Sequence, residues 1–133
     1  MASTQSHSGL RTQLGRVRGL GSSKSGTEHW WMSRLTSLAL VPLGLWFVIS
    51  VIRHLGAPHA EVVAWLSRPW PAVLMILTVG VTFFHAASGL QVVIEDYVHN
   101  EWAKVAAIIA VKFLAALLGA VSIFAVLKIA FGG

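Results

Sequence analysis

The sequence of 133 residues contains no cysteine, which excludes disulfide bonds, thiolate metal sites and thiol nucleophiles. Acidic residues are scarce as well, with 5 Asp and Glu against 10 Lys and Arg, and none of them lies within residues 1–27. In a soluble protein the net charge of +5 would suggest a nucleic-acid partner. We expect none here, because the basic residues do not interleave with aromatic residues on a foldable soluble domain.

Apolar residues, in contrast, make up 56% of the chain, and the mean hydropathy is +0.72. The length fits one domain. A soluble domain of this size cannot cover so much apolar surface, because small domains have a high surface-to-volume ratio. Part of the solvent must therefore be lipid.

Three apolar runs, at residues 35–52, 70–94 and 105–131, are each long enough to cross a bilayer as a helix. Pro42 lies inside the first run, where a kink is tolerated if the helix packs against neighbours. Tryptophan rings favour the membrane interface, and four of them fall near the predicted helix ends: Trp30, Trp31, Trp70 and Trp102. We predict an all-α integral membrane protein with three transmembrane helices.

The runs divide the chain into two parts, an N-terminal cytoplasmic arm at residues 1–33 and a transmembrane anchor domain at residues 34–133. Residues 1–27 resemble a transit peptide in composition, but we favour a mobile arm, and no apolar segment indicates a secretory signal. Between the first two runs, residues 56–69 are predicted to form a loop with an interfacial turn at residues 62–66.

Basic residues predict the orientation, because Lys and Arg stay on the cytoplasmic side of a membrane. One side of the predicted topology carries six of them: Arg11, Arg16, Arg18, Lys24, Arg34 and Lys104. The other side carries three: Arg53, Arg68 and Lys128. We therefore predict that the N-terminus and the second loop are cytoplasmic and that the C-terminus lies on the opposite side.

His85 is the one readily ionisable residue of the second run. An imidazole in hydrocarbon is costly unless it is hydrogen-bonded or ligates something, so such a residue is a functional candidate. Either it bonds a neighbouring helix, or its neutral ring ligates haem iron. Gly89, one turn further on, leaves space for a flat macrocycle or for a close partner helix.

Asp96 and Tyr97 end the second run. Asp96 follows His85 by eleven residues, so on a helix it lies within about 20° of the same face and about 16 Å along the axis. A tyrosine hydroxyl can donate to a quinone oxygen, and a nearby carboxylate can orient that donor or relay protons. The alternative is a helix end exposed to water.

Other charged residues allow two readings each. Arg34 is either a positive flank of the first run or the partner of an anion such as a haem propionate, because guanidinium binds carboxylates in bidentate fashion. Lys112, inside the third run, is expected to snorkel or to pair with another helix. Four histidines lie outside the apolar runs and are expected to be solvated and not ligands: His29, His54, His59 and His99.

The stretch from His85 to Tyr97 resembles the signature of the small hydrophobic membrane anchor subunits of succinate dehydrogenase (complex II). That signature has a His, a Gly four residues later, and an Asp-Tyr pair at the cytoplasmic end of the second helix. Residues 19–36, GLGSSKSGTEHWWMSRLT, resemble the start of alphaproteobacterial members. Met32 is a departure, since members often carry a polar or basic residue there. The resemblance extends from Gly19 to the C-terminus.

This resemblance implies that His85 is an axial ligand of the iron of a haem b, with a second His from the sister anchor of the complex, the cytochrome b anchor. It implies that Tyr97 hydrogen-bonds ubiquinone, that Asp96 supports that site, and that Arg34 lies near a haem propionate. The flavoprotein and iron–sulfur subunits would dock on the cytoplasmic side, oxidise succinate in the tricarboxylic acid cycle, and pass electrons to the quinone. The chain itself would hold no catalytic residue. The implied location is the bacterial inner membrane, with a periplasmic C-terminus.

Three other functions stay open. The chain could be a haem-free structural anchor, in which His85 only packs, or the anchor of a quinol:fumarate reductase, which shares the architecture. A small transporter would place ionisable residues on several helices around a pathway. The first apolar run contains none, which disfavours the transporter.

Overall fold

The computed structural model describes residues 12–19 and 24–132 of the chain. Within these ranges the chain forms helices and no strand, which confirms the predicted all-α fold. The helices are α1 (Gln13–Val17), α2 (Lys24–Arg53), α3 (His59–Leu66), α4 (Pro69–Tyr97) and α5 (Glu101–Ala130). The predicted interfacial turn at residues 62–66 is part of α3.

Among the described residues, three segments are long and apolar enough to cross a membrane, namely Gly26–Arg53, Pro69–Tyr97 and Glu101–Ala130. The predicted number of transmembrane helices is therefore confirmed. α2 begins at Lys24, well before the apolar run, and continues unbroken through residues 33 and 34. No change of secondary structure marks the boundary that we place there, and the boundary stays a prediction. Residues 1–11 and 20–23 of the arm lie outside the described residues.

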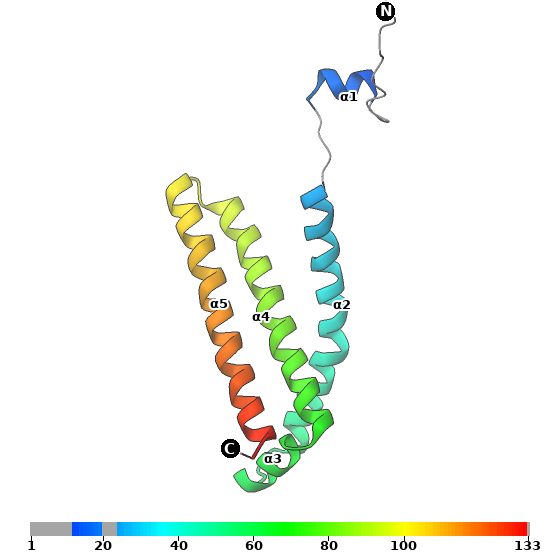
Figure 1. The fold of residues 1–133 in the computed structure, drawn as a ribbon, viewed down its shortest axis with the longest axis vertical. Coiled ribbons are helices and arrows are strands. Elements are labelled where there is room, and N and C mark those ends of the chain that lie inside the picture. Colours follow the sequence, from blue (N-terminus) through cyan, green and yellow to red (C-terminus); the bar gives the residue numbers. More distant parts are fainter. Residues whose placement is uncertain (1–11, 20–23, 133) are drawn as a thin grey trace, which may run out of the picture.

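The three long helices form an open arrangement with α4 in the middle (Figure 1). α4 packs against α5 on one side and α2 on the other, whereas α2 and α5 do not pack against each other. The start of α2, the end of α4 and the start of α5 lie at one end of the bundle. The short helix α3 and the C-terminus lie at the other end, where α3 contacts α4 and α5.

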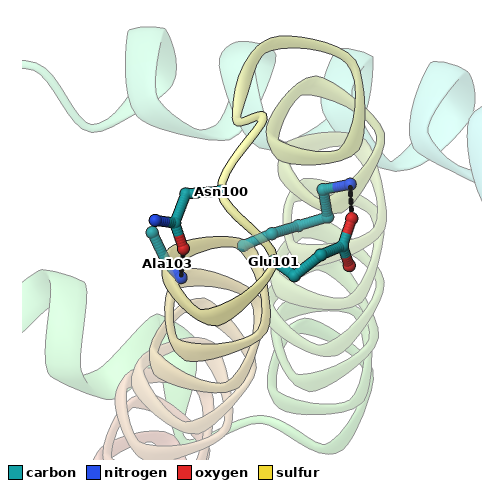
Figure 2. Close-up of polar contacts among 4 residues, drawn as sticks. Asn100, Glu101 and Ala103 are labelled. Atoms are coloured by element: carbon teal, nitrogen blue, oxygen red, sulfur yellow. Dashed lines mark hydrogen bonds and ion pairs between the residues drawn. The ribbon is translucent and has the colours of Figure 1, made fainter.

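Residues 98–100 connect α4 to α5. Asn100 is the N-cap of α5, and its side-chain oxygen accepts a hydrogen bond from the backbone N–H of Ala103 at 3.2 Å (Figure 2). This bond satisfies one of the free N–H groups at a helix start. Lys104 and Glu101 form an ion pair of 3.2 Å on the same turn. The tight, capped connection holds α4 and α5 as antiparallel neighbours.

Among the described residues, the buried apolar core is small and lies at the α3 end. Leu66, Ala72 and Val126 form it, and partly buried side chains pack around them: Trp65, Met75, Ile76, Ile129 and Ala130. In the apolar 18-residue stretch of each span, only 6–11% of the residues are buried inside the described chain, so the apolar side chains of the spans mostly face outward. These faces need cover from lipid or from other chains.

Substitutions at Gly119 test the contact between α4 and α5. Gly119 is buried, and a Cβ at this position would stand 3.6 Å from the Phe83 side chain, an ordinary van der Waals distance. We expect Gly119→Ala to be tolerated and Gly119→Leu to destabilise the protein by about 1–3 kcal/mol through overpacking. The midpoint of thermal unfolding in detergent measures both. Gly44→Leu is the matched control, because a Cβ at Gly44 meets nothing within 4 Å; equal losses at the two positions would contradict the prediction.

Candidate functional site

His85 on α4 is hydrogen-bonded to Thr36 on α2. The Thr36 Oγ1 lies 2.9 Å from the Nδ1 of His85, and Thr36 is buried. The same hydroxyl lies 2.8 Å from the carbonyl oxygen of Met32 and 3.1 Å from that of Ser33. Carbonyl oxygens only accept, so the single hydroxyl proton goes to them. Thr36 therefore accepts from the Nδ1–H of His85, and the free lone pair of the ring lies on Nε2.

This contact confirms that His85 bonds a neighbouring helix, one of the two readings of the sequence. It leaves the other reading open, because metal-ligating histidines almost always donate their second ring N–H to a protein acceptor. A Cβ built on Gly89, one turn from His85, meets nothing within 4 Å. The open space expected at Gly89 is present.

Asp96 and Tyr97 occupy the last turn of α4. Because α4 is unbroken from His85 to Asp96, the two residues share one helical face, as the spacing predicts. Tyr97 is 77% exposed. Within the described part of the chain, neither side chain makes a hydrogen bond or ion pair. Asp96 thus does not orient the Tyr97 hydroxyl in the isolated chain.

Arg34 lies on α2, two residues before Thr36. Its guanidinium carbon stands 5.3 Å from the centroid of the Trp30 ring, one turn away. Trp30 in turn packs edge-on against Trp31 with 5.1 Å between centroids. Such cation–π contacts hold a guanidinium in place without using its N–H donors. Arg34 has no ion pair among the described residues, so these donors are free for an anion.

No three His, Asp or Glu side chains gather into a metal site within residues 12–19 and 24–132. A metal held by His85 would therefore need its other ligands from elsewhere. Three further histidines are exposed, as expected: His29, His59 and His99.

The expectation that His54 is solvated is wrong. Its Nδ1–H donates to the backbone oxygen of Ser50 at 2.8 Å, and its ring packs against Trp65 with 4.5 Å between centroids. The reason is tertiary: α3 brings Trp65 over the end of α2. His54 thus belongs to the end of the bundle that lies far from His85.

A cavity of about 640 Å³ lies on the face of α4 that is flanked by α5 and by His29 of α2. Small and aromatic side chains form most of its wall, and Lys112 lines it without an ion pair among the described residues. The sequence identified Lys112 as a charged residue inside the third apolar run but did not predict this cavity. His85, Asp96, Tyr97 and Arg34 do not line it.

Comparison with known proteins agrees with an integral membrane subunit. The profile of the succinate dehydrogenase/fumarate reductase transmembrane subunit family matches residues 8–119. The succinate dehydrogenase hydrophobic membrane anchor subunit of Paracoccus denitrificans is 33% identical over 116 residues, 87% of this chain and 89% of its own. That of Rickettsia bellii (strain RML369-C) is 32% identical over 109 residues, 81% and 86% of the two chains. No solved structure shows significant similarity.

In the described part of the chain, three helices can span a membrane and share only a small buried core. This is the architecture of a membrane subunit whose apolar faces are covered by lipid or by other chains. The profile match covers most of the chain, and the chain belongs to the succinate dehydrogenase/fumarate reductase transmembrane subunit family. The resemblance carried by residues 19–36 and 85–97 is thereby confirmed.

The bond between Thr36 and His85 predicts a fixed tautomer of the imidazole. In the wild-type chain, ¹⁵N NMR should show the proton of His85 on Nδ1. Thr36→Val removes the acceptor, so the preference should disappear and the chain should lose about 0.6–1.7 kcal/mol of stability. Thr36→Ser keeps the hydroxyl and serves as the control. A wild-type ring protonated on Nε2 would contradict the assignment.

Proposed function

We propose that this chain is the hydrophobic membrane anchor subunit of a succinate:ubiquinone oxidoreductase. In this role His85 would hold the iron of a haem b that is shared with the cytochrome b anchor of the same complex. The hydrogen bond from His85 to Thr36 carries the proposal, because it directs the free lone pair of an intramembrane imidazole away from its own protein partner. The identity with succinate dehydrogenase anchors over most of the chain supports the assignment to this complex.

The described residues fit such a haem. His85 would hold the iron through Nε2, Thr36 would keep the ring in the required tautomer, and the space beside Gly89 would admit the edge of the macrocycle. Arg34, held by Trp30, would pair with a propionate. When bound, the haem exchanges single electrons through its iron. Because His85 is the only histidine inside an apolar run of this sequence, a second histidine for the iron would come from the cytochrome b anchor.

Tyr97 and Asp96 would contribute to the ubiquinone site. The Tyr97 hydroxyl is exposed where α4 leaves the apolar span, so it can donate to a quinone oxygen. Reduction of a quinone to a quinol consumes protons as well as electrons, and Asp96, beside the aqueous boundary, can relay them. This chain forms only part of a wall here. The iron–sulfur subunit and the cytochrome b anchor would supply the rest, with the flavoprotein subunit oxidising succinate.

The proposed membrane and orientation of the chain follow from the same proposal. The chain would lie in the bacterial inner membrane, with its N-terminus and the α4–α5 connection in the cytoplasm and its C-terminus in the periplasm. The excess of Lys and Arg in the sequence before the first apolar run, together with Lys104 after the second, supports this orientation.

A haem-free anchor is the second candidate, and one observation favours it. The Thr36 hydroxyl satisfies the Nδ1 of His85 without any cofactor, so the imidazole is already partnered in the membrane. In that case His85 and Thr36 would serve to join α2 to α4. An anchor of quinol:fumarate reductase is compatible with the same family.

Replacing His85 separates these candidates. In the purified complex, His85→Ala should abolish the haem b band of the reduced-minus-oxidised spectrum, because one axial ligand is lost. His99→Ala removes an exposed imidazole and should leave the band intact. An unchanged spectrum in His85→Ala would dismiss this residue as a ligand, and a wild-type complex without any band would favour the haem-free anchor.

Replacing Tyr97 tests the quinone site. Tyr97→Phe removes only the hydroxyl, so succinate–quinone activity should fall about tenfold, the effect of about 1.4 kcal/mol. Succinate oxidation by an artificial acceptor that bypasses the membrane subunits should be unchanged. If both activities fall equally, Tyr97 acts through assembly of the complex and not at the quinone.

A further inference from the structure

A polar cavity of about 400 Å³ lies at the end of the bundle opposite to Asp96 and Tyr97, beneath α3. Two arginines, a glutamate and a histidine line it together with two tryptophans: Arg53, Arg68, Glu61, His54, Trp46 and Trp65. These residues come from the end of α2, from α3 and from the residue before α4. Nothing in the proposed redox role uses them.

The charges in this cavity are not neutralised by one another. Within the described residues, the side chains of Arg53, Arg68 and Glu61 form no hydrogen bond and no ion pair. Two guanidinium groups and one carboxylate thus line the same cavity, and their hydrogen-bonding atoms are available to a ligand. Two guanidinium groups suit a phosphate, which they bind through several parallel hydrogen bonds. A carboxylate in the same space would repel a plain anion but would bind an ammonium group.

The aromatic wall of the cavity is ordered by its own contacts. The rings of Trp46 and Trp65 are stacked with 6.0 Å between centroids and 26° between planes. His54 packs on Trp65, and its Nδ1–H is committed to the Ser50 carbonyl. In the neutral ring, the Nε2 of His54 is therefore an acceptor at the edge of the cavity.

The depth of the cavity matches the headgroup region of a bilayer. Arg53 is the last residue of α2, and Arg68 is the N-cap of α4, so both guanidinium groups sit where apolar spans end. Tryptophan is the residue enriched at this level. A second cavity of about 330 Å³, with an apolar lining that includes Phe47, Val62 and Met75, lies against the same His54 and Trp65. An acyl chain fits such a surface, whereas a free phosphate has no use for it.

We propose that this end of the chain binds a phospholipid whose headgroup carries both a phosphate and an ammonium, the chemistry of phosphatidylethanolamine. The phosphate lies between Arg53 and Arg68, and the ammonium lies against Glu61. An acyl chain follows the neighbouring apolar cavity. The site is independent of the haem and the quinone, because it lies at the other membrane boundary.

The phospholipid that stays bound to the purified complex tests the proposed lipid site directly. The complex, purified with its partner subunits, is placed in nanodiscs of equal phosphatidylethanolamine and phosphatidylglycerol, extracted into detergent, and analysed by native mass spectrometry. The wild type should retain phosphatidylethanolamine in about tenfold excess over phosphatidylglycerol, which corresponds to about 1.4 kcal/mol. Retention in the supplied ratio, or no retention, overturns the proposal. This measurement needs no variant, so a poorly folding variant does not leave the proposal untested.

Variants then assign the residues. Arg53→Gln with Arg68→Gln should lower the retained phosphatidylethanolamine about tenfold. Lys128→Gln is the matched control, because it removes a positive charge at the same end of the bundle outside the cavity. Glu61→Gln should abolish the preference for phosphatidylethanolamine while a phospholipid stays bound. Equal retention in the double variant and in Lys128→Gln overturns the proposal.

Excess inorganic phosphate distinguishes a lipid site from a site for a free anion. Added to the wild-type complex, it should leave the retained lipid unchanged, because phosphate alone gains nothing from the apolar cavity or from Glu61. Displacement of the lipid by inorganic phosphate overturns the proposal in favour of a simple anion site.

Discussion

An imidazole inside a bilayer is costly unless it is hydrogen-bonded or ligates something. In this chain the hydrogen bond that satisfies the imidazole joins α2 to α4. His85 meets it with Thr36, whose hydroxyl is itself oriented by the carbonyl oxygens of the preceding turn. The proton of the ring is then on Nδ1, and Nε2 is left as a base without a described protein partner. One hydrogen bond thus both holds two helices together and prepares one atom for a ligand.

The rest of the chain contributes little packing of its own. Its buried apolar core consists of Leu66, Ala72 and Val126, near α3, and most of the apolar surface of the three spans faces outward. Lipid cannot distinguish one apolar face from another, so contacts between helices depend on small residues such as Gly119 and on a few hydrogen bonds. This arrangement suits a subunit whose stability is completed by a larger complex.

The two ends of the bundle carry different chemistry. At the end where α4 stops, Asp96 and Tyr97 are exposed and make no bond with each other among the described residues, so they present an acceptor and a donor to whatever binds there. At the other end, Trp46, His54 and Trp65 pack into an ordered wall beside charged groups. The proposed redox site and the proposed lipid site can coexist in so short a chain because the length of the spans keeps them apart.

Much of the fold and part of the candidate site could be predicted from the sequence alone, because a segment that crosses lipid as a helix must be long and apolar. Length and hydropathy determined the three spans, and the unbroken second span fixed His85 and Asp96 on one face, since helical geometry depends only on spacing. The His–Gly–Asp-Tyr pattern led to the family. Only the tertiary structure decided that Thr36 partners His85, that His54 is packed and not solvated, and that Arg53, Glu61 and Arg68 share one cavity. Thr36 and His85 lie 49 residues apart along the chain. The residues of the cavity are closer in sequence, but they lie on different helices, and the angles at which helices cross are set by contacts that no local pattern encodes.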